Sequence, residues 1–144
     1  MNVLVAVDMN PGYDKVLGFA ARLAEQTGGE INVLHVISKA EKEDRENTPG
    51  PSHYVDVMVE ETRRGLEASL VGLGVAKSSI TAIARTGEPA DEIQRVADAN
   101  DVDVLVIGMR RRSRVGKLLL GSDLQELLIS SKRPVVAVPI NAFD

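Results

Sequence analysis

The sequence predicts an α/β fold: a single-domain three-layer sandwich in which helices cover both faces of a five-stranded parallel sheet. Two observations support this prediction. Short apolar, β-branched runs alternate with helical patterns along all 144 residues, and such alternation produces right-handed crossovers between parallel strands. No repeat and no dividing linker interrupts the pattern, and a chain of this length fits one domain, residues 1–144.

Apolar runs of strand length predict the strands. The first run, V-L-V-A-V, is closed by the turn formers Asp8, Asn10, Pro11 and Gly12. The predicted strands are residues 3–7, 31–37, 80–84, 102–107 and 134–138.

Segments with apolar residues at helical spacing predict the helices. They are residues 13–26, residues 55–73, a helix that begins at Glu88-Pro89, and residues 122–131. Pro89 suits the first position of its helix. Residues 38–53 are charged, contain two prolines and show no period, so we predict a flexible loop there.

Composition excludes several classes of function. The net charge of -4 argues against a nucleic-acid-binding protein, which needs a basic face. The absence of cysteine excludes disulfides and thiol chemistry. The N-terminus lacks the pattern of a signal peptide, and no apolar run approaches the roughly 20 residues of a membrane span. We therefore expect a cytoplasmic protein with no nucleic-acid or membrane partner.

The basic residues are concentrated in one place. Residues 110–117 hold five of the 17 basic residues and no acidic residue. In a parallel sheet the ligand lies beyond the carboxyl ends of the strands, where the strand order reverses. With five strands, the natural crevice lies between the ends of the first and fourth strands, so this basic segment is expected at its mouth. A local positive island suits a small anionic ligand.

The segment from Gly108 to Asp123 has two interpretations. If the segment binds phosphate, Gly108 allows a ligand to approach the backbone closely. Gly121-Ser122 then begins a helix whose first amides favour an anion. As a solvated loop, Ser122 and Gln125 would form a capping box, and Asp123 would only favour the helix dipole. Spacing alone leaves both open, with the phosphate site preferred.

Other common sites are not supported. The first strand-to-helix turn, D-M-N-P-G-Y, lacks a dinucleotide fingerprint, and the Walker A pattern fails at Arg111 and Leu118. No H-E-x-x-H or G-x-S-x-G motif is present, so we predict no metal site and no catalytic residue. His35 is expected to be buried and structural, and His53 to be exposed.

The chain resembles the universal stress protein family over nearly its whole length. The matching pieces are V-L-V-A-V-D, V-L-H-V-I, T-G-E-P-A-D-E-I, D-V-D-V-L-V-I-G, L-L-L-G-S and R-P-V-V-A-V-P. Members that bind ATP carry a G-x-x-G-x9-G-[S/T] loop. Gly108, Gly121 and Ser122 match this loop, whereas Arg111 stands at its second glycine.

The resemblance implies the strand order 3-2-1-4-5 of adenine nucleotide alpha hydrolase-like folds, and an adenine nucleotide (ATP, ADP or AMP, alone or with Mg²⁺) as ligand. It places Val36 near the adenine. Arg111 and Asp123 depart from the family's site, which we interpret as a changed rather than a lost site, with Arg110, Arg111 and Arg112 carrying most of the phosphate affinity. The expected nucleotide-binding residues are Val7, Asp8, Met9, Val36, Gly108, Met109, Arg110, Arg111, Gly121, Ser122 and Asp123.

Three functional hypotheses remain open. The first is a nucleotide-binding regulatory protein of the stress response, with an unknown protein partner. The second is a slow ATP hydrolase, and the third is a dimeric interaction protein with a degenerate site. We also expect a homodimer through the last strand, residues 134–138, because Lys132, Arg133 and Pro139 flank this apolar run without interrupting it.

Overall fold

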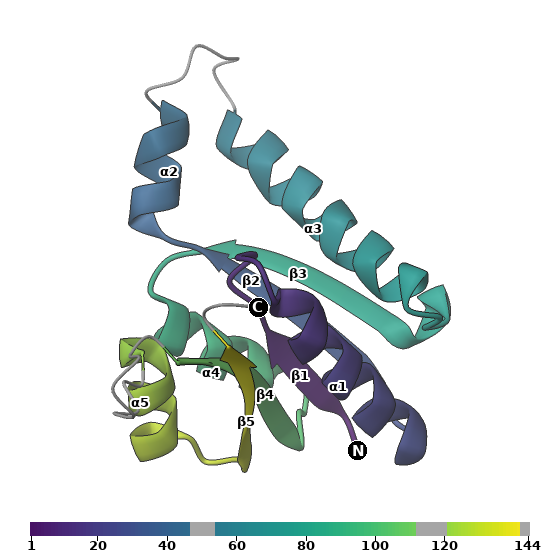
Figure 1. The fold of residues 1–144 in the computed structure, drawn as a ribbon. Helices are drawn as coiled ribbons and strands as arrows, with labels where there is room; N and C mark the ends of the chain where they lie inside the picture. The colour runs from purple at the N-terminus through teal and green to yellow at the C-terminus, as the bar shows by residue number, and fades with distance from the viewer. Residues whose placement is uncertain (47–53, 112–120, 142–144) are drawn as a thin grey trace.

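The computed structural model describes residues 1–46, 54–111 and 121–141, which form a five-stranded parallel sheet in the order β3-β2-β1-β4-β5 with helices on both faces (Figure 1). The predicted fold class and strand order are confirmed. The strands are β1 (Val3–Ala6), β2 (Ile31–Ile37), β3 (Ile80–Thr86), β4 (Val104–Arg111) and β5 (Val135–Asn141). The helices are α1 (Tyr13–Gln26), α2 (Lys39–Glu46), α3 (Tyr54–Gly72), α4 (Pro89–Ala99) and α5 (Ser122–Ser130), and a 3-10 turn spans Lys77–Ser79.

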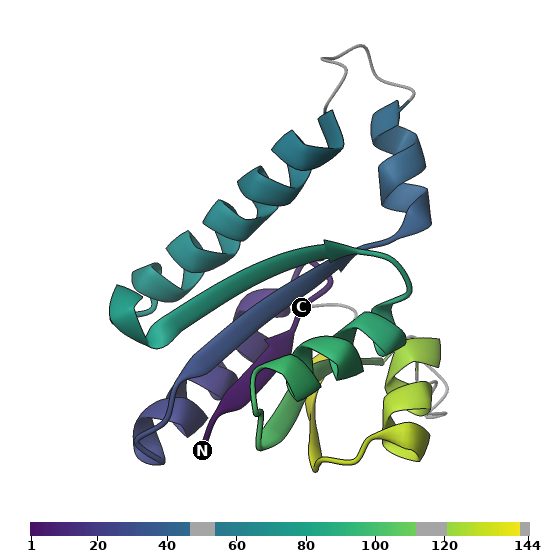
Figure 2. The ribbon, with the colours of Figure 1, turned by 180° about the vertical axis from the view of Figure 1, so that it is seen from behind.

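Helices cover both faces of the sheet (Figures 1 and 2). The core lies in two layers, one on each face. Because successive strand residues point to opposite faces, Val3 and Val5 of β1 pack in the layer under α1 and α3. Leu4 and Ala6 pack in the layer under α4 and α5. Central strands that are buried on both faces explain the continuous apolar runs from which they were predicted.

Helix α2 corrects the predicted flexible loop over residues 38–53. Residues 39–46 are helical, and residues 47–53, which include His53, lie outside the described part. The sequence K-A-E-K-E-D-R-E has no apolar stripe to reveal its period but consists mainly of good helix formers. A capping box starts it: the Glu41 N–H donates to Ser38 Oγ (3.3 Å) and the Ser38 N–H donates to Glu41 Oε1 (3.4 Å). Figure 1 shows α2 and the first turns of α3 projecting beyond the end of the sheet.

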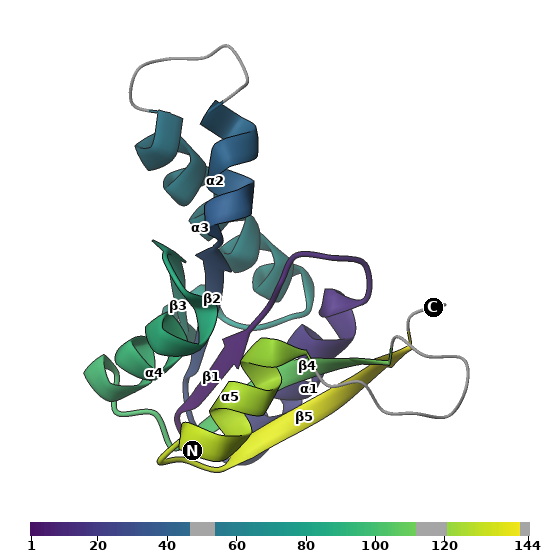
Figure 3. The ribbon, with the colours of Figure 1, turned by 90° about the vertical axis from the view of Figure 1, so that its left-hand side faces the viewer.

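Strand β5 forms one edge of the sheet, and β3 forms the other (Figure 3). Pro139 lies inside β5, in register with Met109, so the expectation that it only flanks the strand is wrong. The strand is longer than predicted because it stays paired with β4 as far as Asn141. The Leu105 N–H donates to the Pro134 carbonyl.

In a parallel ladder, alternate residues of a strand turn their N–H and C=O groups toward the same neighbouring strand. This bond therefore fixes which residues of β5 face β4. The peptide groups of Pro134, Val136 and Val138 turn toward β4, whereas those of Val135 and Ala137 turn outward. Pro139 also turns outward, and its missing N–H therefore falls on the free edge, where a proline is tolerated in a sheet. The free ladder donors expected along all of Val135 to Val138 are thus limited to alternate residues.

Candidate functional site

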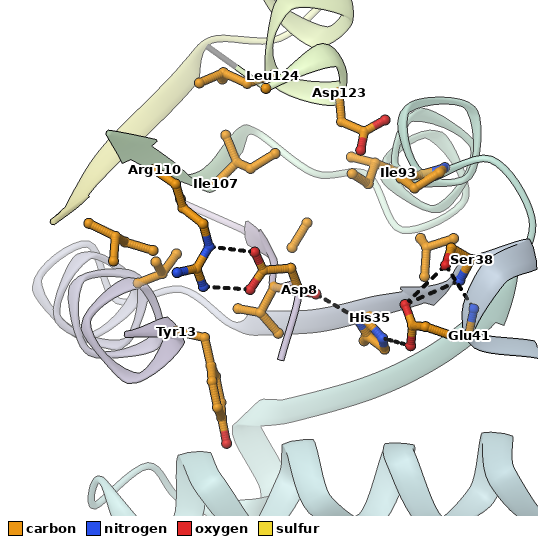
Figure 4. A pocket seen from close by; sticks show the side chains of 18 residues that line it. Asp8, Tyr13, His35, Ser38, Glu41, Ile93, Ile107, Arg110, Asp123 and Leu124 are labelled. Carbon is orange, nitrogen blue, oxygen red and sulfur yellow. Dashed lines mark hydrogen bonds and ion pairs between the residues drawn. The ribbon is translucent and has the colours of Figure 1, made fainter. Parts of the chain in front are cut away.

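A pocket of about 250 Å³ opens at the carboxyl ends of β1, β2 and β4 (Figure 4). Its walls are mostly apolar, and its polar groups include the side chains of Asp8, His35 and Glu41. The residues that line it are Ala6, Val7, Asp8, Tyr13, Val16, His35, Val36, Ser38, Glu41, Pro89, Ile93, Ile107, Gly108, Arg110, Gly121, Asp123, Leu124 and Ile140.

The structure places most of the residues predicted for the site in this pocket. Those that line it are Val7, Asp8, Val36, Gly108, Arg110, Gly121 and Asp123. Met9, Met109 and Ser122 do not line it, although Met9, with a φ of 63°, forms part of the turn that holds Asp8. Arg111 ends β4, and its side chain is outside the described part, as is all of Arg112.

Arg110 and Asp8 form a two-pronged ion pair that joins β4 to the turn after β1. The Nε of Arg110 donates to Asp8 Oδ2 (2.7 Å) and its Nη2 donates to Oδ1 (2.8 Å). Nη1 also donates to the Pro11 carbonyl (2.8 Å), and Nη2 donates to the Asn10 carbonyl (3.1 Å). The guanidinium is thus engaged by the protein itself, which does not favour the expectation that Arg110 carries phosphate affinity.

The same contacts govern the charge of Asp8. Burial alone would raise the pKa of Asp8, but hydrogen bonds from Arg110 and from the Asn10 amide outweigh it and lower the pKa below its ordinary value. Asp8 is therefore an ionised structural carboxylate that ties down the β1–α1 turn.

Two glycines beside the pocket make room for Ile140 of β5. A Cβ on Gly108 would lie 2.7 Å from Ile140 Cδ1 and 3.1 Å from Val16 Cγ2. A Cβ on Gly12, whose φ is 98°, would lie 2.6 Å from Ile140 Cγ2. Gly108 is thus needed for packing between β4, β5 and α1, whether or not a ligand approaches it.

His35 and Glu41 form a polar cluster at the β2 end of the pocket (Figure 4). His35 is buried, as predicted, and its Nδ1 lies 2.7 Å from the Val7 carbonyl oxygen. Because a carbonyl only accepts, Nδ1 carries a hydrogen. Its Nε2 lies 3.0 Å from Glu41 Oε2. A carboxylate also only accepts, so either His35 Nε2 or Glu41 Oε2 must carry a hydrogen for this second contact to be a hydrogen bond.

The opposite end of the pocket is the start of α5. Gly121 is the N-cap, with extended φ and ψ of -63° and 153°, and the Gln125 N–H donates to its carbonyl. Ser122 is the first helical residue, so the predicted capping box with Ser122 as the cap is wrong. Burial, and then the neighbouring Glu88 carboxylate, raise the pKa of Asp123. The negative charge of Asp123 is therefore less favourable in this position than it would be in water.

Sequence reasoning missed several pocket residues: Tyr13, His35 as a lining group, Ser38, Glu41, Ile93, Leu124 and Ile140. Ser38 and Glu41 are absent from the predicted site because residues 38–53 show no apolar period and are predicted as a loop. The sequence S-K-A-E does fit the capping-box pattern and could have indicated a helix start. The apolar residues carry no local mark that separates a pocket wall from a core position.

The described residues offer no resident metal site. Among them, no three His, Cys, Asp or Glu side chains are grouped so that they could hold a metal ion. A search of the same residues also finds no helix with the length and hydropathy of a membrane span.

Comparison with known proteins gives consistent results. The model of the universal stress protein family matches residues 1–139. The chain is 30% identical to the universal stress protein YxiE of Bacillus subtilis over 146 residues, which cover 94% of this chain and 97% of that protein. A universal stress protein of Mycolicibacterium smegmatis is 45% identical over 56 residues, 39% of this chain and 43% of the relative. The chain thus spans less than half of that relative in the match.

Solved structures share the fold. The universal stress protein from Archaeoglobus fulgidus has a TM-score of 0.71 at 26% identity, over 96% of this chain and 98% of that chain. Another A. fulgidus structure, in complex with dAMP, has a TM-score of 0.66 at 22% identity, over 96% and 97%. A universal stress protein in complex with cAMP has a TM-score of 0.70 at 19% identity, over 96% of both chains. With the family model matching nearly the whole sequence, this chain belongs to the universal stress protein family.

Proposed function

We propose that the protein binds an adenine nucleotide in this pocket and acts in the stress response by ligand-dependent conformation or partner binding. The observation that carries the proposal is a mostly apolar cavity at the strand ends, with an extended backbone edge at one end and a helix N-terminus at the other. Cavities of this kind at strand ends of α/β sheets are the usual nucleotide sites. The dAMP and cAMP complexes of structures with the same fold support it.

The β2 end of the pocket suits the base. β1 pairs with β2 only as far as Ala6 and Leu34, whereas β2 continues to Ile37. The Leu34 carbonyl accepts from the Val7 N–H, so the peptide groups of Val36, two residues on, turn to the same side. Beyond the paired part of β1 they are positioned to bond the edge of a purine, with Ile93 and Ile107 as apolar walls.

The α5 end suits the phosphate group. The first amides of α5 and its positive dipole end lie at Gly121, which lines the pocket. Any Mg²⁺ would come bound to the phosphates, as is usual for this ion.

Replacing Gly121 by leucine is expected to weaken nucleotide binding about tenfold or more, because the new side chain would occupy the pocket mouth. No described atom lies within 4 Å of a Cβ at this position, and its φ of -63° accepts any residue. Calorimetry with AMP, ADP, ATP and cyclic AMP gives the measurement.

The matched control is Gly65→Leu, which adds the same side chain to open space on α3, away from the pocket. It should leave affinity unchanged. If the wild-type protein gives no heat and no thermal shift with any of the four nucleotides at millimolar concentration, the proposal is wrong, and a degenerate-site interaction protein becomes the better hypothesis.

Asp123→Asn is expected to tighten binding, and more so for ATP than for AMP. The change removes a carboxylate that burial and Glu88 already make unfavourable and that would repel phosphates at the start of α5. The gain for ATP should be about threefold to tenfold, with little change for adenosine. Asp91→Asn in the exposed first turn of α4 is the control. An equal gain for adenosine and ATP would place the phosphates elsewhere.

A further inference from the structure

Glu41 presents a fixed carboxylate at the β2 end of the pocket (Figure 4). Its Oε2 contacts His35 Nε2 at 3.0 Å, and its Oε1 accepts from the Ser38 hydroxyl at 3.3 Å. The side chain remains 48% exposed. These partners come from β2 and from the residue before α2, so the carboxylate is held from two directions.

This carboxylate keeps unused acceptor capacity. An ionised carboxylate offers about four lone-pair sites. His35 occupies a site on Oε2, and the Ser38 contacts, at 3.3 and 3.4 Å, are long. An acceptor in the wall of a mostly apolar pocket favours a ligand group that donates, and it disfavours one that accepts.

We propose that Glu41 determines base specificity by accepting a hydrogen bond from the exocyclic amino group of a 6-aminopurine. This inference rests on the proposed nucleotide-binding function. It follows from position, because Glu41 lines the same end of the pocket as Val36, whose backbone faces the base edge. A 6-amino group has two N–H donors, one for a backbone carbonyl and one for Glu41. A 6-oxopurine turns an acceptor oxygen toward the carboxylate and is repelled.

The other carboxylates of the pocket do not compete for this role. Asp8 is held by both prongs of Arg110. Asp123 belongs to the α5 end, beside Glu88. Among the described lining residues, Glu41 is therefore the carboxylate placed to meet the base.

The test compares AMP with inosine monophosphate, which carries oxygen in place of the 6-amino group and, in its keto form, a hydrogen on N1. The wild-type protein should bind AMP about 10- to 100-fold more tightly by calorimetry. Glu41→Gln should reduce the preference for AMP about threefold or more, because an amide can donate to the oxygen or accept from the amino group. Any part of the preference that comes from N1 should remain in this variant. Glu41→Ala should lower the affinity for AMP and should leave the affinity for inosine monophosphate unchanged or raise it.

Glu43→Gln is the control, since Glu43 lies on α2 and pairs with Lys39 without lining the pocket. It should retain the wild-type preference. Equal wild-type affinities, or a preference for AMP that is undiminished in both Glu41 variants, would overturn the assignment while leaving nucleotide binding intact. Failure of the wild-type protein to bind either nucleotide would instead overturn the proposed function, and this inference with it.

Discussion

Replacing Arg110 by alanine is expected to lower the free energy of unfolding by about 1–3 kcal/mol, as measured by urea denaturation. The change removes four charge-assisted or carbonyl hydrogen bonds to Asp8, Asn10 and Pro11. It also leaves Asp8 without its cation. The guanidinium is 18% exposed and Asp8 47% exposed, so solvent offsets part of the loss.

Arg110→Lys should recover less than half of this loss, because an ammonium group cannot make the planar two-pronged contact. Arg64→Ala is the matched control, since Arg64 pairs with Glu60 on the exposed side of α3. It should change stability by less than about 0.5 kcal/mol.

The effect on stability should depend on pH in a defined direction. The pKa of Asp8 is lowered from its ordinary value of 3.8 in the folded protein. The ionised Asp8 carboxylate therefore contributes its full share to the free energy of unfolding above pH 3.8. This share is lost as the pH falls through the lower pKa of the folded protein. The difference in stability between the wild-type protein and Arg110→Ala should narrow below about pH 4. A difference that stays constant down to pH 2 would mean that Asp8 is not the partner that matters.

Ligand affinity separates this role from direct phosphate binding. If Arg110 holds the β1–α1 turn, Arg110→Ala should lower the affinities for adenosine, AMP and ATP by similar factors. A larger loss of affinity for ATP than for adenosine, increasing at low salt, would show instead that Arg110 leaves Asp8 and binds phosphate. The cluster of arginines in the sequence predicts that second result.

The fold could be predicted because its signals are local. Continuous apolar runs mark strands buried on both faces, and Gly or Pro marks their ends. Helix α2 was missed because its sequence has no apolar stripe, and helical period is visible in a sequence only where such a stripe exists. The lengths of β4 and β5 were also missed. Each continues through residues such as Arg110 and Pro139, which join a strand only because the neighbouring strand pairs with them.

The site could be located but not assembled from sequence. Strand order predicted that the ends of β1 and β4 meet, which placed Asp8 and Arg110 near one another. That they bond to each other depends on side-chain direction at the two strand ends, which no spacing reveals. Likewise, Gly108 carries a family motif, but its packing reason is Ile140, 32 residues later, which reaches it only in the folded sheet.

The homodimer through β5 is a proposal that the structure makes more specific. The side chains of Val136 and Val138 pack toward the α1 layer rather than outward, so a new contact would be made by backbone. The outward peptide groups are those of Val135, Ala137 and Pro139. Two antiparallel copies centred on Ala137 could pair Ala137 with itself, and the Val135 N–H with the Pro139 carbonyl of the other copy. Because proline has no N–H, the return bond to the Val135 carbonyl is missing in this register, and the Ala137 pair is the one that exchanges both of its bonds.

Ala137→Pro is therefore expected to convert the dimer to monomer at micromolar concentration by light scattering. The change removes the central donor from each copy without touching the ladder to β4, because the Ala137 N–H turns outward. The dissociation constant should rise roughly 100-fold, which corresponds to about 2–3 kcal/mol. Ala137→Ser, which keeps the N–H, should remain dimeric. Lysine at Val136 or Val138 would be a poorer test, because it would disturb the core beside α1 before it disturbed the edge. A wild-type protein that is monomeric at this concentration, or a folded Ala137→Pro protein that stays dimeric, would show that β5 is not the interface.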